Sequence, residues 1–177
     1  MEITILIFLF GGLFLGWSLG ANDAANVFGT AVGTRMVGFT TAAIICSVFV
    51  ILGAIISGAG TTETLGKLGA INALPGAFAA CVAAGISVYL MTKVGLPVST
   101  TQAIVGAIVG WNLYTGSSTN IQVLLTILST WILCPIIAGI IAMGLFTFTK
   151  RVILNRQLHI LRLDAYTRTA LLLAGAF

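Results

Sequence analysis

"GANDAANVFGTAVGTR", residues Gly20 to Arg35, decides the fold, because it places a carboxylate and two amides directly after a long apolar run. An ionised Asp at the centre of a bilayer costs about 2.5 to 3.5 kcal/mol on insertion scales, so it needs a partner, a proton or a cation. On a helix, Asn22, Asp23 and Asn26 share one face through their i,i+3 and i,i+4 spacings. Their oxygens, with carbonyls freed where a helix breaks, would suit a hard cation or a proton. In the alternative interpretation, Asn22 and Asp23 only cap a second half-helix.

The composition around this stretch is that of an integral membrane protein. Of the 177 residues, 59% are hydrophobic and 7% are charged, and the mean hydropathy is +1.14. A soluble globular domain carries roughly 25% charged residues, so this chain lacks the polar surface of one. The alternation of apolar and polar residues that marks β-barrel strands is absent from the sequence. We therefore expect an all-α polytopic membrane protein.

The sequence gives no support for an enzyme or a nucleic-acid-binding protein. It contains no phosphate-binding glycine loop and no Ser/His/Asp constellation, and no aromatic residues interleave its basic cluster. Cys46, Cys81 and Cys134 lie inside apolar segments without metal-ligand spacing, which is typical of small core residues. No cofactor and no nucleic-acid partner are therefore expected.

Hydropathy divides residues 1–149 into a membrane domain of four parts. We expect a discontinuous first helix over residues 3–35, broken at the polar stretch, and a span over residues 39–57. A re-entrant-type helical hairpin is predicted over residues 75–112, because its second arm is too short to cross about 30 Å of hydrocarbon. A last span is predicted over residues 121–149, with a kink at Pro135. The glycines Gly12, Gly16 and Gly20 form a stripe of small residues that predicts close helix packing.

The charged residues at the end of the chain predict its orientation. Six of the twelve lie between Lys150 and Arg168, and residues 150–165 are basic and amphipathic, which is typical of a segment at the membrane interface. The positive-inside rule places this cluster in the cytoplasm, with Arg35 also inside, the N-terminus outside and Lys67 as the exception. Residues 166–177 are expected to begin a further, truncated span.

A second polar stretch, "GLPVSTTQAIVGAIVG", lies at residues Gly95 to Gly110 and contains three consecutive hydroxyl residues, Ser99, Thr100 and Thr101. Pro and Ser at such positions are typical of a helix start, so a well-capped helix is one interpretation. In the functional interpretation, the free N–H groups of that helix start and the hydroxyls together bind an anion without any Arg or Lys.

These two stretches together resemble the inorganic phosphate transporter (PiT) family, whose members move phosphate with Na⁺ or H⁺. "TETLGK" and "STWILCPIIAG" are similar to further family stretches. The resemblance implies a fold of two inverted halves, of which this chain matches the N-terminal one. It implies that the coupling cation is held by Asn22, Asp23 and Asn26. The phosphate would be held by Ser99, Thr100, Thr101 and Gln102.

Two departures from the family pattern bear on these implications. Each motif occurs once, so a second inverted half is expected, either in a missing C-terminal part or in another copy. A homodimer is also expected. Eukaryotic members tend to carry a Glu near the position of Val50. Its absence favours a prokaryotic relative and a location in the inner membrane.

The leading hypothesis is cation-coupled phosphate symport by alternating access, with Na⁺ or H⁺ as the coupling ion. Sulfate transport by the same fold is an alternative within this class. A non-transporting membrane receptor or scaffold is a second alternative. A channel is disfavoured by the lack of charged rings. Glu63 and Lys67 at i,i+4 indicate a helix-surface pair, and no other role is assigned to Glu63.

Overall fold

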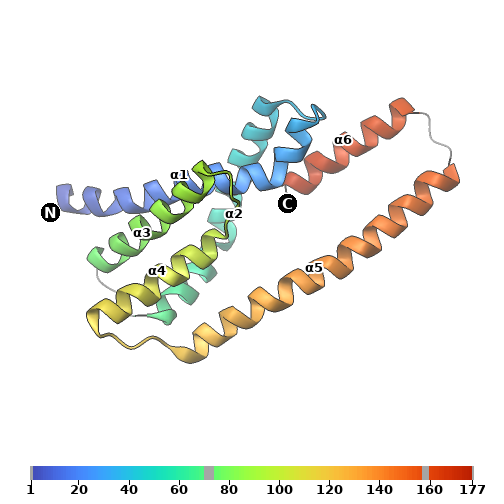
Figure 1. Cartoon of the computed structure of the whole chain (residues 1–177). Coiled ribbons are helices and arrows are strands. Elements are labelled where there is room, and N and C mark those ends of the chain that lie inside the picture. The colour runs from blue at the N-terminus through green and yellow to red at the C-terminus, as the bar shows by residue number, and fades with distance from the viewer. Residues whose placement is uncertain (1, 70–73, 157–159, 177) are drawn as a thin grey trace.

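The computed structural model describes residues 2–69, 74–156 and 160–176, and these form six helices and no strands (Figure 1). The helices are α1 (Glu2–Gly33), α2 (Phe39–Leu68), α3 (Leu74–Lys93), α4 (Thr100–Thr115), α5 (Ile121–Arg156) and α6 (Ile160–Ala176). In the described part, α1, α2, α3 and α5 are long and apolar enough to cross a membrane. The prediction of an all-α polytopic membrane protein is confirmed.

The first helix is not discontinuous. α1 runs without interruption from Glu2 to Gly33, so the break predicted within residues 3–35 is wrong. The prediction assumed that Asn22 and Asp23 would need backbone groups opened within their own helix. Both side chains instead form hydrogen bonds with residues near the start of α4, so α1 keeps its own backbone hydrogen bonds intact.

Two further helix boundaries differ from the prediction. α2 continues beyond residue 57 to Leu68, and inside it the hydroxyls of Thr62 and Thr64 donate to the carbonyls of Gly58 and Gly60, so these polar side chains are satisfied within the helix. The described residues of the interfacial segment predicted over residues 150–165 belong to α5 and α6. Its first residues continue α5, which meets no Gly or Pro between residues 145 and 156 that would end it. Its last residues begin α6, and residues 157–159 lie outside the described part.

α1 packs along α3, and α4 returns antiparallel to α3, so that α3 and α4 form a helical hairpin beside α1 (Figure 1). Two glycines make the contact between α1 and α3 close. A Cβ atom on Gly11 would lie 2.8 Å from the Phe78 ring, and one on Gly85 would lie 2.7 Å from the Phe14 ring. The stripe predicted to pack, Gly12, Gly16 and Gly20, has no atom of another residue within reach of a Cβ in the described part.

Apolar side chains gather at two places along these helices. One cluster joins the C-terminal part of α1 to the start of α2 and to α6. Its members include Phe28, Ala31, Val37, Ala42, Leu171 and Leu172. The other joins α2, α3, α4 and the start of α5 at the open end of the hairpin. Its members include Leu68, Ala80, Val105, Ile108 and Ile127.

The turn between α3 and α4, residues 94–99, is called the hairpin tip below. α3 ends in a Schellman-type cap, in which Gly95 N–H donates to the Thr92 carbonyl and Leu96 N–H to the Met91 carbonyl, each at 3.0 Å. Gly95 has a φ of +78°, the left-handed conformation that favours glycine. The tip is therefore a defined turn that fixes where α4 begins.

Gly95→Ala should lower the stability of the folded protein by about 1 to 2 kcal/mol, because a Cβ disfavours the left-handed backbone conformation. The measurement is unfolding of the detergent-solubilised protein by heat or denaturant. Gly106→Ala is the matched control, since Gly106 lies inside α4 in open space. At Gly106 the change to alanine should raise the stability of the folded protein by about 0.5 to 1 kcal/mol, because alanine favours the helix more than glycine does. Equal effects at both sites would contradict the role of Gly95 in the turn.

Candidate functional site

The start of α4 is set by Ser99. Ser99 has extended backbone angles (φ −83°, ψ 113°), and its Oγ accepts a hydrogen bond of 3.3 Å from the Gln102 backbone N–H. This is the N-cap geometry predicted for Ser99. It leaves Thr100 as the first helical residue, so the free N–H groups of the first turn lie at the end of α4 that adjoins the tip.

Asn22 of α1 joins the tip directly. Its Nδ2 donates to the Val98 carbonyl at 2.7 Å, and its Oδ1 accepts from the Val98 N–H at 3.3 Å. Asn22 is only 3% exposed. The two polar stretches are therefore in direct contact, although 76 residues of sequence separate the two partners.

The Asp23 carboxylate lies between Asn22 and α4. One oxygen, Oδ1, accepts from Asn22 Nδ2 at 2.7 Å, and the other, Oδ2, accepts from Thr100 Oγ1 at 3.3 Å. Within residues 2–69, 74–156 and 160–176, no Lys or Arg forms an ion pair with Asp23. A carboxylate held by two neutral donors keeps lone pairs and a negative charge for a further ligand.

The remaining predicted site residues lie around this group but do not bond to it. Asn26, Thr101 and Gln102 are exposed, and their side chains form no hydrogen bond with any described residue. Sequence reasoning missed the Val98 backbone, whose only signal was its place between a proline and a helix cap. It also missed Ser18, one turn before Asn22, which is 1% exposed with an Oγ that has no partner in the described part.

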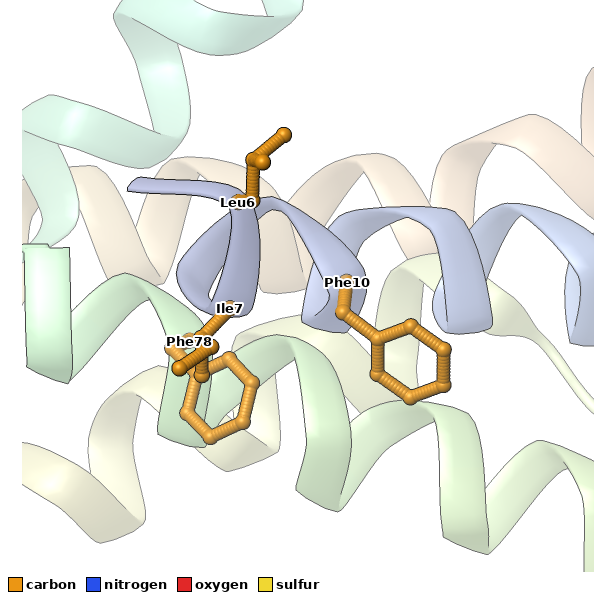
Figure 2. A pocket seen from close by; sticks show the side chains of 4 residues that line it. All are labelled: Leu6, Ile7, Phe10 and Phe78. Carbon is orange, nitrogen blue, oxygen red and sulfur yellow. The ribbon is translucent and has the colours of Figure 1, made fainter. Parts of the chain in front are cut away.

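Other features lie away from this site. The predicted Glu63–Lys67 ion pair is present on the surface of α2, where both side chains are largely exposed. An open hollow of about 410 Å³ is lined by Leu6, Ile7, Phe10 and Phe78 (Figure 2). Its lining side chains are all apolar, and Phe10 is 13 residues before Asp23 on α1, or roughly 20 Å along the helix. It is not the polar site.

The described residues contain no group of three or more His, Cys, Asp or Glu side chains that could hold a metal ion. Carboxylate and amide oxygens such as those at Asp23 and Asn26 are the kind of ligand that suits a hard monovalent cation. The site thus combines an uncompensated carboxylate with a hydroxyl-rich helix N-terminus.

The helices and this site define a class: a multi-span helical membrane protein with a polar site between a long helix and a hairpin tip, as in secondary transporters. Within that class, the chain belongs to the phosphate transporter family, which it matches over residues 19–174. It is therefore a membrane protein of a transporter family and not an enzyme.

The relatives agree with this assignment. The chain is 37% identical over 166 residues to "Putative phosphate permease PF1020" of Pyrococcus furiosus, covering 88% of this chain and 39% of the relative. It is 33% identical over 158 residues to "Putative phosphate permease" of Haemophilus influenzae, covering 82% of this chain and 37% of the relative. A solved structure named "The sodium-dependent phosphate transporter" matches with a TM-score of 0.73 and 31% identity, covering 84% of this chain and 39% of that one. The chain thus spans about two fifths of the length of these proteins.

Proposed function

We propose that the protein carries out cation-coupled symport of inorganic phosphate across the cell membrane. The observation that carries the proposal is the hydrogen bond from Thr100, in the first turn of α4, to the unpaired carboxylate of Asp23. This contact supports the proposal because it joins the group that would bind the cation to the helix start that would bind the anion. The family and its relatives support phosphate as the anion.

The anion part of the proposed site is the N-terminal turn of α4. A helix N-terminus carries roughly half a positive charge and free N–H groups, which favour an oxyanion. Ser99, Thr100, Thr101 and Gln102 surround that turn, and the side chains of Ser99, Thr101 and Gln102 are exposed. A neutral site of this kind binds phosphate weakly enough to release it, as transport requires.

The cation part of the proposed site is Asp23, with Asn26 one turn further along α1. Two unit charges 4 Å apart interact by about 4 kcal/mol at an effective dielectric constant of 20. An unneutralised Asp23 would therefore repel phosphate from the start of α4. Loading Asp23 with a cation removes that repulsion, and this makes phosphate binding depend on the ion. We propose Na⁺, in line with the name of the similar solved structure, with H⁺ as the alternative.

The full transport site requires more than this chain. We propose that a second, inverted half completes it, because the relatives are about two and a half times longer than the matched region. Alternating access would then come from the two halves moving around the shared site. We also propose a homodimer in a prokaryotic inner membrane, with the N-terminus outside and residues 150–168 in the cytoplasm.

Phosphate and sulfate differ in a way that this site can detect. Near neutral pH, phosphate keeps at least one P–OH donor, and sulfate keeps none. A carboxylate has about four lone-pair sites, so Asp23 with Na⁺ bound still offers an acceptor to a P–OH group beside the helix start, and this favours phosphate. We expect excess sulfate to leave labelled phosphate uptake into proteoliposomes unchanged. If sulfate inhibits the uptake of labelled phosphate as strongly as unlabelled phosphate does, the site does not select phosphate, and sulfate transport becomes the better proposal.

Thr100→Val tests the link between the two parts of the site. Valine keeps the shape of threonine but cannot donate to Asp23, so phosphate uptake driven by an inward Na⁺ gradient should fall about tenfold or more. Thr100→Ser retains the hydroxyl and should stay within about threefold of the unchanged protein. Uptake that ignores both Na⁺ and H⁺ gradients in the unchanged protein would reject the symport proposal.

A further inference from the structure

We propose that Asn22 is a positioning residue that clasps the hairpin tip to α1, and that it does not serve as a ligand of the coupling cation. The amide of Asn22 uses both its oxygen and its nitrogen on the Val98 backbone. The part of this assignment that concerns transport rests on the proposed function. The clasp itself rests only on the contacts between α1 and the tip.

The backbone of Val98 explains why a clasp is needed. Val98 lies between the cap that ends α3 and the N-cap that begins α4, in a segment outside both helices. A partly buried N–H and C=O without partners would each cost free energy comparable to a lost hydrogen bond. In the described part, Asn22 supplies the hydrogen bonds that a neighbouring strand would supply in a sheet.

The same amide also orients the carboxylate. Asn22 Nδ2 donates to Asp23 Oδ1, while Thr100 Oγ1 donates to Asp23 Oδ2. Asn22 therefore holds Val98 of the tip, and Asp23 accepts from Thr100 of α4. Together these contacts fix the position of the Asp23 carboxylate relative to the start of α4. A cation reaching Asn22 would have to enter a site that is only 3% exposed and whose oxygen already accepts from the Val98 N–H.

Asn22→Ser separates the two roles. Serine keeps a neutral oxygen that can bind a cation, but it is too short to bridge both backbone groups of Val98. We expect hydrogen exchange at the Val98 amide to speed up about tenfold or more. The phosphate concentration for half-maximal uptake should rise about tenfold, while the Na⁺ concentration for half-maximal uptake, at saturating phosphate, changes less than about twofold. Ser87→Ala, on the exposed face of α3, should change none of these quantities.

Val98→Pro removes one backbone partner of Asn22 and leaves Asn22 itself unchanged. Proline lacks the N–H that donates to Asn22 Oδ1. The substitution should therefore also raise the phosphate concentration for half-maximal uptake, while leaving the Na⁺ concentration for half-maximal uptake unchanged. The proposal is overturned if Asn22→Ser raises the Na⁺ concentration for half-maximal uptake tenfold and leaves the rate of hydrogen exchange at the Val98 amide unchanged. It is also overturned if Val98→Pro has no effect on phosphate. Should the unchanged protein show no phosphate uptake, the symport proposal fails, and the exchange measurement still decides whether the clasp exists.

Discussion

Asp23→Asn should abolish the cation dependence of phosphate uptake and reduce Na⁺ affinity by a large factor. Asparagine has nearly the same shape and can still accept from Thr100, although its amide nitrogen can no longer accept from Asn22 Nδ2. The change removes one negative charge beside the proposed cation. At about 4 Å and an effective dielectric constant of 20, that charge contributes about 4 kcal/mol, which corresponds to roughly a thousandfold in affinity.

The measurement is uptake of labelled phosphate into proteoliposomes at varied external Na⁺, with and without an imposed gradient. Asp164→Asn is the matched control, because Asp164 forms an exposed ion pair with Arg168 on α6, away from the site. Exposed pairs of this kind contribute about 1 kcal/mol or less, so the control should behave like the unchanged protein. Phosphate uptake by Asp23→Asn with an unaltered Na⁺ dependence would remove Asp23 from the coupling mechanism.

Gly85→Leu should prevent α3 from packing against α1 and so disassemble the site without changing any of its residues. A Cβ at Gly85 would already lie 2.7 Å from the Phe14 ring and 3.4 Å from the Leu15 Cα, and the backbone of α1 cannot rotate away as a ring can. Overpacking a close contact costs typically 1 to 3 kcal/mol for small additions, and leucine adds three more carbons beyond the Cβ. We expect a protein that unfolds at lower temperature and transports no phosphate.

Gly53→Leu is the control for this substitution. Gly53 also lies inside a long helix, α2, but no atom of another described residue lies within 4 Å of its Cβ position. In a lipid-facing position, leucine should be tolerated or slightly stabilising, since it replaces a weak helix former with a strong one. A Gly85→Leu protein with normal stability would show that the contact between α1 and α3 is looser than the structure indicates.

The helical class and the two polar stretches could be predicted from the sequence because both are local signals. Composition alone excludes a soluble domain, and the Pro97–Ser99 pattern marks a helix start wherever it occurs. The contact of Asn22 with Val98 could not be derived in this way. Its two partners are 76 residues apart, and nothing in either stretch specifies the other as its partner.

The errors have the same physical origin. The break in α1 was predicted because local polarity was assumed to need local satisfaction, and tertiary hydrogen bonds to the tip and to Thr100 supply it instead. The stripe Gly12, Gly16 and Gly20 meets no described residue of this chain, since spacing identifies a stripe of small residues but not the helix that faces it. Gly11 and Gly85 form the close contact because their faces meet an aromatic ring on the neighbouring helix.

The continuity of α1 has a mechanical consequence. Its N-terminal part is packed against α3, while its C-terminal part, through Phe28 and Ala31, is packed with α2 and α6. Asn22 and Asp23 lie on α1 where one set of contacts gives way to the other. α1 is therefore one stiff rod shared by two groups of helices, with the proposed ion site at the point where its contacts change. If the α3–α4 hairpin rotates and moves α1 with it, the C-terminal part of α1 must move too, because the helix is unbroken. We therefore expect the packing of α1 against α6 to change in the same motion.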